Sequence, residues 1–154
     1  MRVSPRLRAV YSLIKGNVLA DIGTDHGFLP IFACLQNEKL RAVACDFNQG
    51  PLERAKENIK QYGLENRIDT RLGFGIEPLG DDETECVVIA GMGGMNIVEI
   101  LKEPRQVKRL ILQPQRDLSL VKDFVTGRGY VIINEITVED RGRKYTVIGA
   151  ENDC

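Results

Sequence analysis

The sequence lacks several features that mark other classes of protein. Its 154 residues include no tryptophan, one histidine and four cysteines, and no two of these cysteines form a C-x-x-C pair. Zinc sites and disulfide frameworks depend on such clusters, so we expect neither, and no metal. No apolar run approaches the length of a bilayer span, and the basic start of the chain lacks the apolar core of a signal peptide. We therefore expect a cytoplasmic protein with no membrane partner.

Charge and length set further limits. The formal net charge is -1, so the general excess of positive charge that nucleic-acid binding favours is missing, and any such binding would depend on local clusters. A chain of 154 residues is long enough for one substantial core and too short for two. We expect residues 1–154 to form one domain with one site. The sequence does not predict the oligomeric state.

Apolar periodicity predicts alternating helices and strands. Helices are expected over residues 5–15, 30–36, 51–62, 94–102 and, with Asp117 as the cap, 118–127. Strands are expected from residue 18 and over residues 42–45, 68–72, 86–90, 109–113, 130–137 and 145–150. The central runs are apolar without alternation, which is typical of buried parallel strands. The segment VEDRGRK between the last two strands is too short for a helical crossover, so the seventh strand should run antiparallel.

The most informative segment is VLADIGTDHG at residues 18–27. An apolar run ends at Asp21 and turns through Gly23 and Gly27 into the next helix, and glycine lets the backbone approach a ligand closely. Asp46 ends the next apolar run, where an acid reaches a ribose diol in a doubly wound sheet. A tight turn with a capping aspartate would explain the first segment but not Asp46 as well. Together they predict a cofactor site.

The same turn separates two classes of cofactor. A dinucleotide site favours G-x-G-x-x-G, whereas this turn has Asp25 between more widely spaced glycines. An acid at that place would repel a pyrophosphate, but not S-adenosylmethionine, whose sulfonium and amino groups are cationic. By fold analogy, the antiparallel last strand supports the same choice. The expected class is α/β: a Rossmann-like class I S-adenosylmethionine-dependent methyltransferase with a seven-stranded, mostly parallel sheet.

Several segments resemble one family in order and spacing. RLRAV at 6–10, ADIGTDHGFLP at 20–30, GFG at 73–75, IAGMGG at 89–94 and LQPQ at 112–115 are similar to the bacterial tRNA (adenine-22, N1)-methyltransferases. The resemblance implies methyl transfer to N1 of an adenine in the D-loop region of tRNA. Two departures stand out: Phe74 occupies a position where the family typically has an acid, and the family's helical coiled-coil domain is absent. We therefore expect cofactor binding to persist and tRNA binding to be weak or lost.

Candidate residues for each role follow from these motifs. Asp25 is the expected catalytic group with His26 beside it, because the lone pair of adenine N1 needs positioning and charge stabilisation more than a strong base. A hydrogen-bonded loop role that supports Asp25 explains His26 equally well. The cofactor-binding candidates are Asp21, Gly23, Thr24, Gly27, Asp46, Phe47, Gly73, Phe74, Ala90, Gly91 and Met92. The tRNA-binding candidates are Arg6, Arg8, Gln113 and Gln115.

Some interpretations stay open at this level. Gln113 and Gln115 are suited to bind a base or the backbone of the neighbouring loop, and the basic hairpin residues 141–144 to bind phosphates or only solvent. The glycines of the segment at 89–94 stand where amino-group methyltransferases often have an Asn- or Asp-Pro-Pro-aromatic motif, which argues against exocyclic-amine chemistry. The alternatives are a methyltransferase of the same fold acting on a small molecule or protein, and a non-catalytic cofactor-binding protein that recognises RNA. A dehydrogenase comes last.

Overall fold

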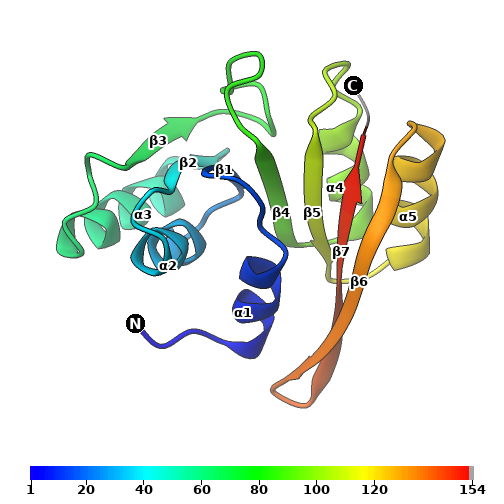
Figure 1. Cartoon of the computed structure of the whole chain (residues 1–154), viewed down its shortest axis with the longest axis horizontal. Coiled ribbons are helices and arrows are strands. Elements are labelled where there is room, and N and C mark those ends of the chain that lie inside the picture. Colours follow the sequence, from blue (N-terminus) through cyan, green and yellow to red (C-terminus); the bar gives the residue numbers. More distant parts are fainter. Residues whose placement is uncertain (153–154) are drawn as a thin grey trace.

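The computed structural model describes residues 1–152 as alternating helices and strands (Figure 1). In chain order the elements are α1 (Pro5–Ser12), β1 (Val18–Ile22), α2 (Phe28–Gln36), β2 (Arg41–Asp46), α3 (Gln49–Gln61), β3 (Ile68–Leu72), β4 (Cys86–Met92), α4 (Gly94–Leu101), β5 (Arg109–Pro114), α5 (Leu118–Gly127), β6 (Val131–Asp140) and β7 (Arg143–Glu151). All the expected elements are present, and their bounds differ by a few residues.

The strands form one seven-stranded sheet in the order β3-β2-β1-β4-β5-β7-β6. The first five strands in this order are parallel, and β7 pairs antiparallel with both β5 and β6. The predicted Rossmann-like fold with an antiparallel last strand is confirmed. The strand order changes direction between β1 and β4, because the chain returns from β3 to place β4 beside β1, so the loops that follow β1 and β4 diverge. Ligands of open α/β sheets bind in the crevice that results.

Alternate residues of the strands build two cores, one on each face of the sheet. Leu19 of β1 packs in the core that α1, α2 and α3 cover, and the next residue, Ala20, packs in the core that α4 and α5 cover. Figure 1 shows the first three helices and the last two as separate layers. Both faces of the central strands are therefore buried, which explains why those strands are apolar without alternation. Strand β6, at the edge, instead alternates between exposed and half-buried residues.

Three boundaries differ from expectation for physical reasons. Helix α1 ends at Ser12 rather than residue 15, because the Leu13 carbonyl accepts hydrogen bonds from the buried Arg109 guanidinium at 2.8 and 3.0 Å. Helices α2 and α3 begin two residues before Pro30 and Pro51, which still lie in the first turn, where a missing N–H costs no helical bond. Asp117 does occupy the predicted N-cap position of α5, but its backbone is left-handed at φ 61° and its side chain makes no capping hydrogen bond.

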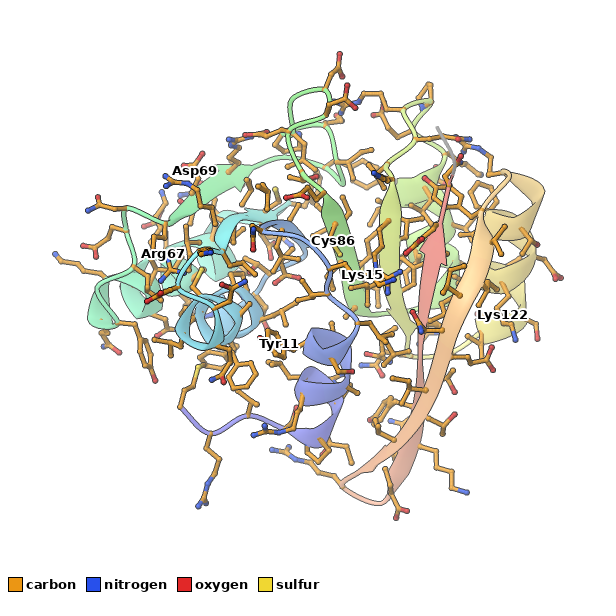
Figure 2. The ribbon with its side chains drawn as sticks, viewed as in Figure 1. Tyr11, Lys15, Arg67, Asp69, Cys86 and Lys122 are labelled. Atoms are coloured by element: carbon orange, nitrogen blue, oxygen red, sulfur yellow. The ribbon has the colours of Figure 1, made fainter. Side chains whose placement is uncertain are left out.

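The interior of the protein holds uncharged cysteine thiols, whereas ion pairs lie at its surface. Cys34, Cys45 and Cys86 are buried and free of disulfides, and burial raises the pKa of Cys86 to about 11. Cys154 lies outside the described residues. Figure 2 places Cys86 in the interior and Lys122 on the outer helix, where its Nζ lies 2.8 Å from Glu135 Oε1 of β6. Within residues 1–152, no helix combines the length and apolar character needed to cross a membrane.

Candidate active site

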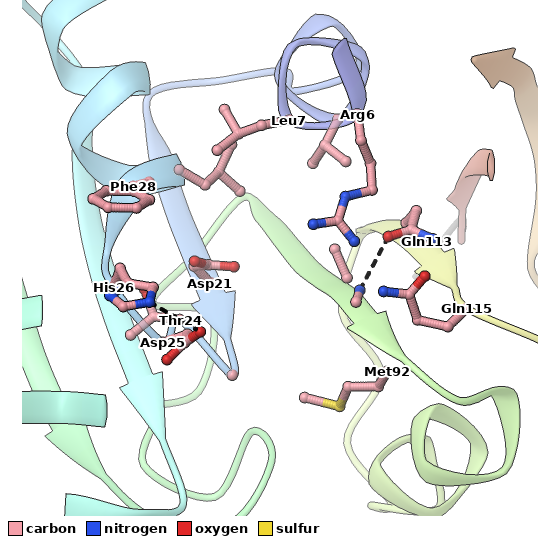
Figure 3. A pocket seen from close by; sticks show the side chains of 15 residues that line it. Arg6, Leu7, Asp21, Thr24, Asp25, His26, Phe28, Met92, Gln113 and Gln115 are labelled. Carbon is pink, nitrogen blue, oxygen red and sulfur yellow. Dashed lines mark hydrogen bonds and ion pairs between the residues drawn. The ribbon is translucent and has the colours of Figure 1, made fainter. Parts of the chain in front are cut away.

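A cavity of about 340 Å³ lies at the crevice between the carboxyl ends of β1 and β4 (Figure 3). The predicted residues that line it are Arg6, Asp21, Gly23, Thr24, Asp25, His26, Ala90, Gly91, Met92, Gln113 and Gln115. Figure 3 shows Asp21, Asp25 and His26 on one wall, and Arg6, Gln113 and Gln115 on the other. The fold thus brings both proposed catalytic residues and residues from two distant glycine motifs to one cavity.

The turn after β1 is fixed to the end of β2. The amides of Gly23 and Thr24 both donate to the Cys45 carbonyl at 2.9 Å, and the Asp25 amide donates to Asp46 Oδ2 at 3.1 Å. Gly23 has a φ of 73°, and a Cβ there would collide with the end of the Met92 side chain. Glycine is therefore favoured at this position mainly by the backbone conformation, because the flexible end of the Met92 side chain could move away from a Cβ.

Asp21 is a buried carboxyl group on the cavity wall, 6% exposed. Burial raises its pKa from 3.8 to about 7, the neighbouring Thr24 hydroxyl opposes this rise, and the charge of Asp46 adds to it. The charged side chain that acts on Asp21 is thus another carboxylate rather than a cation. Such a site favours a cationic ligand, because a positive charge in the cavity would stabilise the ionised form of Asp21.

Asp25 and His26 are more exposed and contact each other. Asp25 Oδ2 lies 3.6 Å from His26 Nε2, and Asp25 Oδ1 lies 3.4 Å from an Arg54 guanidinium nitrogen. The His26 ring stacks on Phe28 with ring centres 5.0 Å apart. His26 therefore contacts Asp25, as its supporting role would require, and its direct role in catalysis stays a prediction. The Asp25 carboxylate remains accessible from the cavity.

A bulge at the end of β4 shapes the other wall. Gly91 stands in the irregular register between Ala90 and Met92 with φ 80°, and its amide donates to Gln113 Oε1 at 3.1 Å. Gln113 is fully buried and also donates to the Pro114 carbonyl at 3.0 Å, so it binds loop backbone, one of its two expected roles. Gln115 differs, because its Oε1 is buried without a hydrogen-bond partner among the described residues. Bulges of this kind are frequent beside active sites.

The remaining predicted residues lie outside this cavity. Asp46 is 7% exposed, and its oxygens accept the amides of Asp25 and Asn48 at 3.1 and 3.0 Å. Phe47 is 65% exposed and contacts Phe74 edge to face, with ring centres 5.9 Å apart. These residues and Gly73 follow β2 and β3, on the side of β1 away from β4. They form a second edge of the candidate site, and their roles stay predictions.

Two other predicted residues have packing contacts instead. A Cβ at Gly27 would lie 3.2 Å from the Ala55 Cβ, so this glycine allows α2 and α3 to approach closely. The Arg8 guanidinium lies over the Phe32 ring at 5.5 Å, away from the cavity. The sequence interpretation missed four apolar lining residues, Leu7, Val10, Phe28 and Leu29. Leu7 and Val10 recur at helical spacing in the sequence, which indicates one apolar face of α1, but this spacing does not reveal that the face also borders a cavity.

Comparisons with known proteins agree with this geometry. A family model described as "Methyltransferase domain" matches residues 3–148. A tRNA (adenine(22)-N(1))-methyltransferase of Bacillus subtilis is 35% identical over 156 aligned residues, which cover 98% of this chain and 66% of the relative. The chain thus spans just under two thirds of that relative's length. Within the described residues, no group of three or more metal-ligating side chains occurs.

Solved structures give the same result. The crystal structure of the B. subtilis m1A22 tRNA methyltransferase TrmK superimposes with a TM-score of 0.91 and 36% identity, covering 98% of this chain and 67% of that one. TrmK of M. capricolum in complex with the cofactor product S-adenosyl-homocysteine gives 0.89 and 34% identity, covering 98% and 69%. The chain therefore belongs to the methyltransferase domain family and, within it, to the family of bacterial tRNA (adenine(22)-N(1))-methyltransferases.

Proposed function

We propose that this chain is an S-adenosylmethionine-dependent methyltransferase that acts on N1 of adenine 22 in bacterial tRNA. The observation that carries the proposal is the buried carboxyl of Asp21 in the crevice, with its raised pKa and a carboxylate as its charged neighbour. That environment fits a cationic cofactor and does not fit a pyrophosphate. The likeness to tRNA methyltransferases over 98% of the chain supports the choice of substrate.

The residues on both sides of β1 fit such a cofactor. S-adenosylmethionine supplies an electrophilic methyl group on a sulfonium. The glycines at positions 23 and 91 leave the cavity open where side chains would fill it, and Asp21 provides negative charge. On the second edge, Asp46 has lone pairs left to accept ribose hydroxyls, and the exposed rings of Phe47 and Phe74 offer faces for an adenine. We assign cofactor binding to these residues.

The other wall of the cavity suits the target base. Gln115 lines this wall, and its Oε1 is buried without a hydrogen-bond partner among the described residues; a rotation of the side chain that turns this oxygen into the cavity would let it accept the exocyclic amino hydrogens of an adenine, a pairing that leaves N1 unblocked. During transfer, positive charge leaves the sulfur and arrives on the adenine ring, and the Asp25 carboxylate across the cavity stabilises that charge. His26 orients Asp25 through their contact. The base must be unstacked to enter, as in other enzymes that modify a base in RNA or DNA.

Cationic side chains supply the contact to the RNA backbone. Arg6 lines the cavity, and its guanidinium lies over the Tyr145 ring at 5.4 Å. This contact holds the arginine at the rim, where a phosphate next to the target nucleotide would pass. Arg8 lies two residues farther along α1, roughly half a turn around the helix and away from the cavity, so it would contact phosphates farther from the base. A cytoplasmic location, where tRNA is found, belongs to the same proposal, as does a single catalytic domain over residues 1–154.

Transfer to an unmodified tRNA tests the function. After incubation with labelled cofactor, mass mapping should find one methyl group at N1 of adenine 22. Asp25→Asn, which tolerates the left-handed backbone of residue 25, should lower the transfer rate by about 10²-fold and change cofactor affinity little. Asp123→Asn, on the exposed side of α5, is the matched control.

Three outcomes would contradict the proposal. Equal rates for the Asp25 variant and its control would remove Asp25 from catalysis. Transfer to a metabolite or protein but not to tRNA would favour a methyltransferase of the same fold with another substrate. Cofactor binding in calorimetry without any transfer would favour a non-catalytic protein that recognises RNA.

A further inference from the structure

A second cavity adjoins the candidate active site. It measures about 720 Å³ and lies between the first residues of the chain, α1 and the tip of the β6–β7 hairpin. Arg6, Leu7, Phe28 and Gln115 line both this cavity and the first one. The two cavities therefore adjoin along these four side chains, and the second one leads on from the proposed base pocket to the hairpin tip. We call this second cavity, lined by residues 1–4, 62, 140, 141 and 145 among others, the hairpin groove.

The hairpin reaches this position because it projects past the rest of the sheet. Strand β5 pairs only with residues 148–151 of β7, whereas β6 pairs with β7 along its whole length to Asp140 and Arg143. Thr137 and Thr146 add a side-chain hydrogen bond of 3.1 Å across the hairpin. Figure 1 shows the tip extending beyond α1, toward the N-terminal segment. A free hairpin arm placed beside the active site is well suited to contact a large substrate.

Positive charge gathers in the hairpin groove although the chain as a whole has a net charge of -1. Arg2, Arg6 and Arg141 line it from three different segments. Arg143 lies over the Tyr145 ring at 5.7 Å, on the same ring that Arg6 contacts. Asp140 also lines the groove and stands opposite Arg143 in the strand register, but the lining has three arginines against this one acid, so cations predominate.

Aromatic rings lie between these cations. Phe28 and Tyr62 line the groove and are each 42% exposed, and Tyr145 is half-buried between two guanidinium groups. Grooves that hold single-stranded nucleic acid combine these two elements, because phosphates bind cations and bases stack on aromatic faces. An acidic peptide would use the charges but would leave the exposed rings without a flat partner.

We propose that the hairpin groove binds the nucleotides that flank the target adenine, as an unpaired RNA strand. Their phosphates contact Arg2, Arg6 and Arg141, and a flanking base stacks on Phe28 or Tyr62. The inference rests on the proposed function, since it takes the first cavity as the pocket for the target base. The groove would thereby favour an unpaired RNA loop over a paired stem, because a paired stem could not place one base in the cavity and its neighbours on the rings.

Removal of two groove charges tests the inference. Arg2→Gln combined with Arg141→Asn removes them, and asparagine tolerates the φ of 53° at residue 141. The matched control, Lys39→Gln combined with Lys108→Gln, removes the same amount of charge. Both lysines are exposed and lie just before β2 and β5, at the amino ends of the strands and away from the groove. For each protein, the KM for a tRNA transcript is measured between low and moderate salt. In parallel, the affinity for a fluorescent single-stranded RNA is measured by anisotropy.

The groove variant should lose about 1.5 in the slope of log affinity against log salt, since each lost phosphate contact lowers it by roughly 0.7 to 0.9. The turnover number and the calorimetric cofactor affinity should stay unchanged, and the control should match the parent chain. Equal slopes for the groove variant and its control would overturn the inference while leaving the proposed function intact. If the parent chain transfers no methyl to tRNA, the proposed function fails, and the anisotropy slopes still decide whether the groove binds RNA.

Discussion

Polar groups are buried at both ends of the parallel strands, which we call the amino edge and the carboxyl edge of the sheet, but only at the amino edge do all those that the structure describes have hydrogen-bond partners. At the amino edge, Arg109 is 3% exposed and fully partnered: it donates to the Leu13 carbonyl, to Asn134 Oδ1 at 2.9 Å and to Glu151 Oε2 at 2.6 Å. At the carboxyl edge, Asp21 is buried beside another carboxylate, and Gln115 Oε1 has no partner among the described residues. The first arrangement stabilises the fold, and the second leaves capacity for a ligand.

The difference in hydrogen bonding follows from the segments that cover each edge. The end of α1 supplies a free helical carbonyl to Arg109, and the last strand supplies Glu151, so the structure itself completes that site. Glycine turns close the carboxyl edge, and they leave space instead of side chains. Groups that are buried but incompletely satisfied reduce stability, and such costs concentrate at functional sites.

Substitution of Arg109 should give the largest effect, a loss of stability. Arg109→Met would leave the Leu13 carbonyl and Asn134 Oδ1 without their buried donor, so the free energy of unfolding should fall by about 2–4 kcal/mol. Urea denaturation measures this change. Lys15→Met is the control, because Lys15 contacts the same Glu151 oxygen at 3.3 Å but its side chain is 63% exposed. The control should lose at most about 1 kcal/mol. Equal losses would show that the amino edge has no special role in stability.

Substitution of Asp46 should give the next largest effect, a loss of cofactor affinity. Asp46→Ala removes the proposed ribose acceptor and the anchor of the Asp25 amide, so cofactor affinity should fall about 10- to 100-fold, as expected for a hydrogen bond to a charged group. Calorimetry measures the affinity. Asp69→Ala, an acid of β3 that pairs with Arg71, serves as the comparison variant. An unchanged affinity for Asp46→Ala would place the cofactor elsewhere.

Asp21 should give a smaller effect that depends on pH. With its pKa raised to about 7, Asp21 is mostly protonated below that pH, whereas a cationic cofactor favours the carboxylate. Binding then releases a proton, so cofactor affinity should fall as pH drops below 7, by up to about tenfold per unit. Asp21→Asn should abolish this slope, and His26→Gln should keep it. A flat profile in the parent chain would contradict contact between Asp21 and the cationic part of the cofactor.

The same group has a predictable effect on stability. Because the folded-state pKa of Asp21 lies above the unfolded value of 3.8, the folded chain holds a proton that the unfolded chain has lost between about pH 4 and 7. Asp21 therefore lowers stability progressively as pH rises through that window, and the loss is complete above pH 7. In urea titrations, Asp21→Asn should remove this decline. A decline of equal size in the variant would assign it to other groups.

The sequence predicted what local chemistry determines. Alternating periodicity indicated every element, and the glycines at positions 23 and 91 do adopt the positive φ values that a ligand-facing turn uses. What it could not predict depends on distant contacts. Arg109 shortens α1 from the far end of the chain, and Gln113 turns inward because the Gly91 amide needs an acceptor. The apolar wall of the cavity, with Phe28 and Val10, follows only once α1 is packed over the crevice.

The carboxylate of Asp46 has one oxygen on the Asp25 amide, which joins the two working parts of the molecule. The acid that we propose binds the ribose of the cofactor thus also positions the loop that we propose lies against the substrate. Substitutions that retune one task will disturb the other. An engineer who wants a new methyl acceptor should therefore vary Gln115, whose Oε1 makes no hydrogen bond to another described residue.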